Sequence, residues 1–269
     1  LVQLKTVENV QQAKGELFQA LNKRGTAVIN ADDPLVLGLA QSLQARRITF
    51  VINNPADVRA GNIYPRDNDG FDFTVTLPGK TFQVHLPFLG YCNIYNALAA
   101  IATGYTLGFT PEEITKGLTQ SQLMHQRGEI THHGSMTIIN DAYNANPQSM
   151  REALGILHRY KCPGRKFFVM GDMLELSDTA QTAHARLGEE IAKHDVDYLV
   201  TVGDLSSFAG ESAKESGMKK DRVVSTKTHQ EAVDYLTSNA QSGDCLMFKG
   251  SRGSAMEKVI QGLIQKKNI

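Results

Sequence analysis

Four short segments of this sequence place carboxylates, amides, hydroxyls and cations directly after runs of apolar residues. They are residues 141–146, 171–176, 203–207 and 249–254. Asp and Asn side chains in such places hold hydroxyls, amides or phosphate-bound metal ions. A single segment of this kind is often an ordinary turn, because Asn and Asp form turns readily. Four such segments in one chain favour a binding site.

The segment 249–254 has the composition of an anion site. Lys249 and Arg252 flank Ser251, and two Gly and two Ser residues lead into a predicted helix. The N-terminus of a helix attracts anions through its free N–H groups. The alternative is that Gly and Ser only form the turn while the two cations are solvated, and for this segment alone the two interpretations are balanced.

Amides and cations that could bind a ligand also occur at three other positions along the chain. Asn93 and Asn96 stand three apart at a predicted helix start, so they share one face. Their amides cap that helix, or read the edge of a purine, because each offers a donor and an acceptor. Arg127 lies in a predicted connection, where it clamps a phosphate or is simply solvated. Lys14 falls in a helical pattern, and from the pattern alone it is an exposed helical lysine.

The elements that must position the four segments alternate between strand and helix. Apolar strands are predicted at 137–141, 166–171, 198–203 and 245–249, and a helical pattern follows each. Such alternation predicts a parallel sheet with helices on both faces. The carboxyl ends of parallel strands meet at one edge, where doubly wound sheets bind ligands. We therefore expect a doubly wound α/β domain.

The part of the chain before residue 128 has a different order of predicted elements. A helical pattern comes first, then strands at 27–30 and 48–52, and then a β-hairpin over 71–84 that turns at Pro78-Gly79. An Ala-rich helix is predicted at 96–107. Thr110-Pro111-Glu112-Glu113 then opens a helix with a capping box and with Pro in first position. Two further capping boxes are predicted at 228–231 and 254–257. Because the pattern of elements changes there, we expect a domain boundary near residue 128, which gives domains 1–128 and 129–269.

Composition excludes several classes of protein. The chain has 269 residues, 41% of them hydrophobic, and its 28 Lys and Arg balance its 28 Asp and Glu. A zero net charge does not favour nucleic acid or an anionic membrane as partner. No apolar run approaches the roughly 20 residues of a membrane span, and no signal peptide is visible. The three cysteines are far apart, which fits a reducing, cytoplasmic compartment.

Two common nucleotide motifs are absent. Neither G-x-x-x-x-G-K-[ST] nor G-x-G-x-x-G occurs in the sequence. If the protein uses a nucleoside triphosphate, the loop that holds the phosphates lies outside this sequence. The chain begins at Leu1, inside a helical pattern, and we interpret it as a fragment or a processed piece.

Several strings occur together in the order seen in Mur ligases. They are residues 90–100, the DAYNANP string from Asp141, the GDMLEL string from Gly171, and the KGSR string from Lys249. The chain resembles, over nearly its whole length, the branch of that family that adds D-alanyl-D-alanine. Mur ligases have three domains. Residues 1–128 resemble the later part of the central ATPase domain, including the small β-hairpin region, and 129–269 the C-terminal Rossmann-like domain.

The resemblance implies an ATP-dependent amide-bond ligase of peptidoglycan precursor synthesis. In this family ATP phosphorylates the carboxylate of UDP-MurNAc-tripeptide, the amine of D-Ala-D-Ala attacks the acyl phosphate, and phosphate leaves. Mg²⁺ spreads the developing charge. ATP and Mg²⁺ are therefore the expected cofactors. The protein is expected to be a monomer, and this chain alone is expected to be inactive, because the phosphate loop is missing.

The resemblance also implies a role for five residues on the nucleotide side. Lys14 matches the family's carbamylated lysine, whose carbamate helps to bind magnesium. Carbamylation needs a neutral amine, so a metal-facing and partly buried setting is implied. Asn93 and Asn96 match the adenine-side motif, Arg127 the arginine near the phosphates, and Asp141 the ribose-binding carboxylate.

Six further residues are implied on the substrate side. Three lie beside Asp141 and would face the incoming amine: Tyr143, Asn144 and Asn146. Three more are weaker candidates for binding the acceptor dipeptide: Lys249, Ser251 and Arg252. The chain departs from the family pattern at two neighbouring positions. Cys92 stands where His is usual, and Gln126 stands where Gly commonly precedes the arginine.

Three alternatives differ in what they require. A family member that adds a diamino acid carries an Asp-Asn-Pro-Arg motif, which this sequence lacks. Folylpolyglutamate synthetase shares the architecture, but the loop strings fit it poorly. A non-catalytic nucleotide-binding module is the alternative from another class. An upstream G-x-x-x-x-G-K-[ST] loop with a His just before Leu1 would favour the ligase.

Overall fold

The computed structural model describes residues 6–267, which form two compact units, 6–122 and 123–267. The sequence predicted the division at residue 128. The segment 123–128 groups with the second unit because its backbone bonds there: Gly128 N donates to Asn140 O at 2.9 Å, and Tyr143 N donates to Gln126 O at 3.1 Å.

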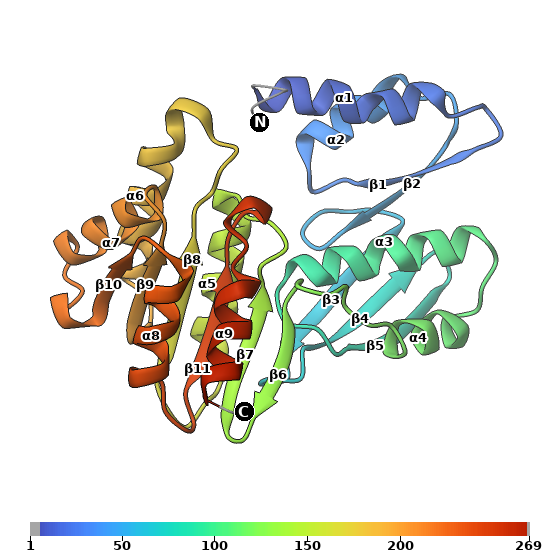
Figure 1. The fold of residues 1–269 in the computed structure, drawn as a ribbon. Coiled ribbons are helices and arrows are strands. Elements are labelled where there is room, and N and C mark those ends of the chain that lie inside the picture. Colours follow the sequence, from blue (N-terminus) through green and yellow to red (C-terminus); the bar gives the residue numbers. More distant parts are fainter. Residues whose placement is uncertain (1–5, 268–269) are drawn as a thin grey trace. The chain divides into compact units, whose positions relative to one another are not determined.

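Within the described residues, the first unit contains one sheet in the order β1-β2-β3-β4-β5 (Figure 1). The first three strands are parallel, and the last three form an antiparallel meander. The strands are β1 (Thr26–Asn30), β2 (Arg46–Val51), β3 (Val58–Pro65), β4 (Phe71–Leu77) and β5 (Lys80–Leu86). The helices are α1 (Val7–Ala20), α2 (Pro34–Leu39), α3 (Cys92–Thr106) and α4 (Pro111–Thr119).

Two apolar clusters hold this unit together. Ala27 and Ile29 of β1 pack with Phe18 of α1 and Val36 of α2. The larger cluster joins β2 to β5 with α3 and α4 around Phe73, which is fully buried. The predicted hairpin is confirmed as β4 and β5, and Gly79 supplies the positive φ of +74° that its turn requires.

Local patterns located the helices of the first unit with mixed success. The capping box at Thr110 is confirmed, since its hydroxyl accepts from Glu113 N and Glu113 accepts from Thr110 N. Helix α3 begins at Cys92, four residues before the predicted start at residue 96. The sequence did not predict β3, where Asn62 has a φ of +48° and the pairing with β4 shifts register between Gly61 and Tyr64.

The second unit, in the part that the structure describes, is built on a sheet in the order β10-β9-β8-β11-β7-β6. All neighbours are parallel except the edge pair β6 and β7. The strands are β6 (Glu129–His133), β7 (Met136–Asp141), β8 (Lys166–Gly171), β9 (Tyr198–Val202), β10 (Val223–Thr226) and β11 (Cys245–Lys249). The four apolar strands predicted from the sequence are confirmed as parallel neighbours. The polar edge strand β6 was not predicted.

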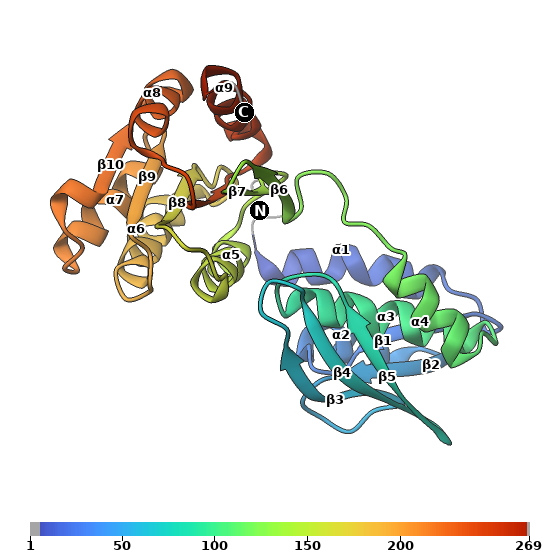
Figure 2. The same ribbon diagram turned by 90° about the horizontal axis from the view of Figure 1, so that it is seen from below.

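Helices cover both faces of this sheet. Helices α5 (Pro147–Arg159), α6 (Ala180–Ile191) and α7 (Ser206–Glu215) lie on one face, and α8 (His229–Asn239) and α9 (Glu257–Lys267) on the other (Figure 2). The chain therefore leaves the neighbouring strands β7 and β11 toward opposite faces. Such a reversal at the carboxyl ends is where doubly wound sheets bind ligands.

The two remaining capping boxes gave different outcomes. Thr228 caps α8 by accepting from Glu231 N, but the Glu231 carboxylate accepts from Lys227 N, one residue earlier than a full box requires. The box predicted at Ser254 is wrong. Its hydroxyl donates to Asp172 O, Ala255 takes a φ of +46°, and α9 begins only at Glu257.

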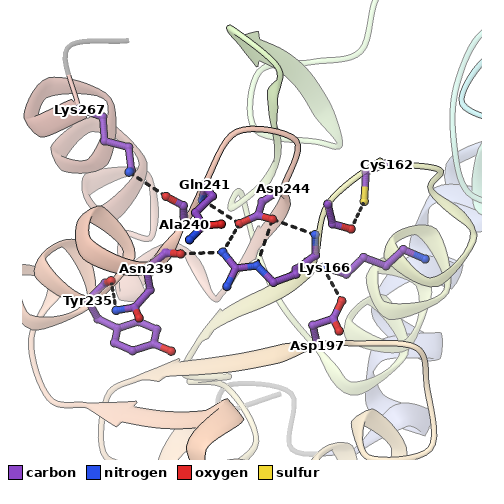
Figure 3. A network of polar contacts seen from close by, with 11 residues as sticks. Cys162, Lys166, Asp197, Tyr235, Asn239, Ala240, Gln241, Asp244 and Lys267 are labelled. Atoms are coloured by element: carbon purple, nitrogen blue, oxygen red, sulfur yellow. Dashed lines mark hydrogen bonds and ion pairs between the residues drawn. The ribbon is translucent and has the colours of Figure 1, made fainter.

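A polar network fastens the opposite, amino edge of the same sheet (Figure 3). The Arg165 guanidinium donates to both carboxylate oxygens of Asp244, at 3.2 and 2.6 Å, and to Asn239 O at 2.7 Å. Asp244 is 2% exposed and also accepts from Gln241 N. The network ties the turn between α8 and β11 to the start of β8.

Candidate functional site

Polar loops gather at the carboxyl edge of the second unit's sheet, because β7, β8, β9 and β11 are parallel and all end there. Asp172 links three of these loops. Its carboxylate accepts from Ser206 N at 2.7 Å, and its carbonyl accepts from Ser251 N at 3.0 Å and from the Ser254 hydroxyl at 2.8 Å. The loops thus form one hydrogen-bonded group.

Ser251 joins the loop after β11 to the two loops beside it. Its hydroxyl accepts from Leu174 N at 3.0 Å and donates to Ala145 O at 3.3 Å. Ser251 is 3% exposed. The predicted contact of Ser251 with a substrate stays a prediction, and what the structure shows is that its hydroxyl holds neighbouring loops together.

Asp141 and Lys249 stand opposite each other in the register of β7 and β11. The Lys249 ammonium lies 2.6 Å from the Asp141 carboxylate and also donates to Asn144 O at 3.1 Å. Burial raises the pKa of the Asp141 carboxyl, while the charges of Lys249 and Arg127 oppose that rise. Lys249 is 3% exposed, and its ammonium binds both ends of the 141–144 segment, which holds that segment in place.

Arg127 lies against the same loop. Its guanidinium is 4.0 Å from the centre of the Tyr143 ring, a cation–π contact, and both side chains are exposed. Its positive charge acts on Asp141. The structure therefore brings three predicted residues together: a carboxylate, an exposed guanidinium and an exposed aromatic ring.

The two asparagines of the loop have local roles. Asn144 accepts from Ala145 N at 2.9 Å. Asn146 is the N-cap of α5, where its oxygen accepts from Ser149 N at 2.8 Å and Ser149 Oγ accepts from Asn146 N at 3.0 Å. Both asparagines are exposed, and their predicted place beside the incoming amine stays a prediction.

A buried histidine that the sequence analysis missed supports the loop after β8. His184 is fully buried in α6, where its Nε2 accepts from Met173 N at 3.0 Å and its Nδ1 donates to Ala180 O at 2.7 Å. Burial lowers the pKa of this imidazole, which fixes the neutral form. The signal in the sequence is its place on the apolar side of α6, in line with Ala180 and Leu187.

In the first unit, Asn93 and Asn96 lie in the first turns of α3 as predicted. Asn93 Nδ2 donates to Leu89 O at 2.6 Å, and Asn96 Nδ2 donates to Asn93 Oδ1 at 3.2 Å. Among residues 6–267 no partner is present for Oδ1 of the exposed Asn96. That oxygen and the remaining amide hydrogens are an acceptor and donors for a ligand.

Asp32 forms a second polar group in the first unit, which the sequence analysis did not predict. Its carboxylate accepts from Ile52 N at 2.7 Å, Asn53 N at 3.0 Å, Asn54 Nδ2 at 2.7 Å and the Tyr95 hydroxyl at 3.0 Å. Burial opposes ionisation, but these bonds hold the pKa of Asp32 below its usual value. Burial and the bond to Asp32 raise the pKa of Tyr95 to about 12. Asp32 lies two residues after the end of β1, and Asp141 is the last residue of β7, so a carboxylate at the end of a strand is the signal that could have found it.

Lys14 is exposed on α1, so the partly buried, metal-facing setting that the resemblance implies is not found for it within residues 6–267. The described residues also contain no group of three or more His, Cys, Asp or Glu placed to hold a metal ion. Across the same residues, no helix is long and apolar enough to cross a membrane.

Comparison with known families gives two matches that together span most of the chain. The "Mur ligase middle domain" matches residues 1–104, and "Mur ligase, glutamate ligase domain" matches residues 126–252. This chain belongs to the Mur ligase family. Its first unit therefore corresponds to the middle domain of a Mur ligase, and its second unit to the C-terminal domain.

Relatives of this Mur ligase chain agree on one branch. The UDP-N-acetylmuramoyl-tripeptide–D-alanyl-D-alanine ligase of Bacillus subtilis is 34% identical over 96% of the chain and 55% of its own length. The enzyme of the same name from Escherichia coli is 31% identical over 96% of the chain and 56% of its own length. The chain thus spans about half the length of the curated relatives that it matches.

Solved structures show the same fold. A MurF structure from Acinetobacter baumannii is 30% identical, covers 96% of this chain and 56% of its own, and superimposes with a TM-score of 0.86. A MurF ligase from Thermotoga maritima in complex with ADP is 20% identical with a TM-score of 0.80, covering 98% of this chain and 58% of its own. At that identity the second structure supports the fold alone.

Proposed function

We propose that this chain forms part of an ATP-dependent ligase that joins D-Ala-D-Ala to UDP-MurNAc-tripeptide through an acyl phosphate. The observation that carries the proposal is the group at the carboxyl end of β7, where Asp141 lies with the exposed Arg127 and Tyr143. The names of the relatives, all ligases of D-alanyl-D-alanine, supply the substrates. Peptidoglycan precursor synthesis is the pathway that these substrates define.

Each unit, taken by itself, offers groups that suit a nucleotide. Asn96 and Asn93 offer amide donors and an acceptor suited to the edge of adenine. The Asp141 carboxylate is an acceptor for the two ribose hydroxyls, and Arg127 is a cation for phosphoryl oxygens.

The phosphates and the metal ion require more than these residues. The sequence contains no Walker A loop, and the described residues do not make up a Mg²⁺ site. Lys14, as a carbamate, would supply one ligand at most. We keep its carbamylation as a proposal: in the full-length protein Lys14→Ala should cripple turnover, and bicarbonate should not restore it.

The acceptor side uses exposed groups of the loops after β7 and β11. Tyr143, Asn144, Asn146 and Arg252 present polar or aromatic groups to solvent, and we propose that they face the acceptor dipeptide. The buried Lys249 and Ser251 serve the acceptor by holding those loops in place. The dipeptide amine then attacks the acyl carbon, the new C–N bond forms, and inorganic phosphate leaves with the electrons of the broken C–O bond.

Product analysis tests this proposal. The full-length gene product is incubated with ATP, Mg²⁺, UDP-MurNAc-tripeptide and one acceptor, and the amide product is identified by mass spectrometry. We expect product and phosphate release with D-Ala-D-Ala and none with D-Ala or diaminopimelate. Product with a single amino acid only would assign the chain to another branch, and no product with any acceptor would favour a non-catalytic module. The isolated chain should not hydrolyse ATP.

A further inference from the structure

Gln126 adopts a backbone conformation that rarely suits its residue type. Its φ is +63°, in the left-handed region where glycine is unstrained and a side chain is not. The Mur ligase pattern has Gly at this place. Gln126 is nonetheless 7% exposed, so its side chain is enclosed by protein rather than projecting into solvent. A strained backbone conformation of this kind persists only where surrounding contacts hold the residue in place.

The compensating contact is to Arg252. Gln126 Oε1 accepts from Arg252 Nη1 at 2.8 Å, across 126 positions of the sequence. Because arginine has only donors, the carbonyl end of the amide must face it, so the orientation of the amide is determined. The backbone of Gln126 is held as well: its carbonyl accepts from Tyr143 N at 3.1 Å, and its N–H points to Glu129 at 3.4 Å.

The bonds of Arg252 leave one edge of its guanidinium available. Nη1 donates to Gln126 and, at 3.3 Å, to Glu257. Within residues 6–267 no acceptor is present for Nε or Nη2, and the side chain is 62% exposed. Nε and Nη2 together form the planar fork that binds a carboxylate through two parallel hydrogen bonds.

We infer that Gln126 is a positioning residue that fixes Arg252 so that its Nε–Nη2 edge receives a carboxylate. The identity of that carboxylate rests on the proposed function: the terminal carboxylate of the acceptor dipeptide is the group that Arg252 binds. Two anchors on Nη1 restrict rotation of a long side chain before the ligand arrives. The Arg252 side chain then loses less conformational freedom when the carboxylate binds, which increases the affinity.

Two substitutions separate the side-chain bond from the backbone strain. Asn tolerates the left-handed region best among non-glycine residues, but it is one methylene shorter, so Gln126→Asn withdraws the amide from Arg252. Gln126→Glu keeps an acceptor at the same reach. Gln261→Asn makes the same chemical change at an exposed position of α9 and serves as the matched control.

Steady-state kinetics of the full-length protein give the first readout. A hydrogen bond to a charged group corresponds to a roughly tenfold or larger change in affinity, so KM for D-Ala-D-Ala should rise about tenfold in Gln126→Asn. The values of kcat, KM for ATP and Tm should stay near those of the wild type, and Gln126→Glu should restore KM. An unchanged acceptor KM, or a rise in KM for UDP-MurNAc-tripeptide or ATP instead, would overturn the inference.

Chemical modification gives a second readout that does not depend on turnover. Phenylglyoxal modifies arginines, and the rate at Arg252 is followed by peptide mass spectrometry. Loss of the Gln126 bond should speed modification several-fold in Gln126→Asn and not in Gln261→Asn. Equal rates in all variants would overturn the positioning role. If the wild type makes no product with D-Ala-D-Ala, the proposed function fails, and the modification rates still decide whether Gln126 restrains Arg252.

Discussion

Lys249 and Ser251 illustrate how burial decides the role of a single residue. Both belong to the segment 249–254, whose residue types and spacing predict an anion site, yet both are 3% exposed and bonded to neighbouring loops. Arg252, one position further, is exposed. The difference arises because β11 lies between β8 and β7, so side chains at its end meet loops on either side. Residue types alone do not contain that strand order.

The neutral state of His184 leads to a prediction on pH. Its pKa is lowered from the ordinary 6.5, so below that pH the unfolded chain binds a proton that the folded chain resists. The free energy of unfolding should therefore fall as pH drops below about 6.5, by at most roughly 1.4 kcal/mol per pH unit from this group.

His184→Gln provides the comparison, because its Oε1 takes the place of Nε2 as acceptor for Met173 N but does not titrate. Urea denaturation of both proteins at pH 7.5 and 5.5 measures the difference. The variant should lose less stability between the two pH values than the wild type. All other histidines contribute equally to the pH dependence of both proteins. Identical losses of stability would therefore contradict the lowered pKa of His184.

Tyr95 and Asp32 give a second prediction at the residue scale. The carboxylate of Asp32 and burial together raise the pKa of Tyr95 to about 12. Asp32→Asn removes the negative charge, so the pKa of Tyr95 should fall toward its model-compound value of 10.0. Titration of ¹³Cζ-labelled tyrosine by NMR resolves individual residues. A Tyr95 pKa unchanged by the substitution would show that Asp32 does not govern it.

At the scale of elements, the network at the amino edge of the second sheet should contribute strongly to stability. Asp244 is 2% exposed and joins Arg165 to the turn before β11. Asp244→Ala removes the acceptor of several N–H groups and leaves Arg165 partly buried, so we expect a loss on the order of 3 kcal/mol in the free energy of unfolding.

Asp195→Ala is the matched control for that measurement. Asp195 pairs with Lys166 near the same edge but is 69% exposed, so its loss should cost below about 1 kcal/mol. Urea denaturation monitored in both variants compares the two. Similar losses would mean that burial of Asp244 does not set its contribution.

Elements with strong patterns were predictable, and those with weak patterns were not. Apart from Lys166 at the start of β8 and Lys249 at the end of β11, these two strands are apolar, because both of their faces are buried. The edge strand β6 is mostly polar, and β3 is interrupted by an irregular register, so neither has a clear period. The capping box predicted at Ser254 was wrong because its hydroxyl is used by Asp172, a residue 82 positions away.

At the scale of the whole molecule, the edge of the second sheet that carries the candidate site followed from parallel strands alone. The residues that hold the site together did not. Asp172, His184 and Gln126 act through partners on other elements, and a pattern along the chain does not reveal such pairs. The departure at Gln126 was visible in the sequence, but its physical meaning required its φ angle and its bond to Arg252.

We propose that the carboxyl edge of the second unit's sheet, through Asp141, serves a nucleotide-dependent ligase. The most direct test of this claim is KM for ATP in the full-length protein carrying Asp141→Asn, with Asp195→Asn at the opposite edge as control and Tm measured for both. Because the carboxylate is proposed to accept from the ribose hydroxyls, KM should rise about tenfold or more in Asp141→Asn and stay unchanged in the control. Wild-type KM and kcat in a folded Asp141→Asn variant would contradict the claim.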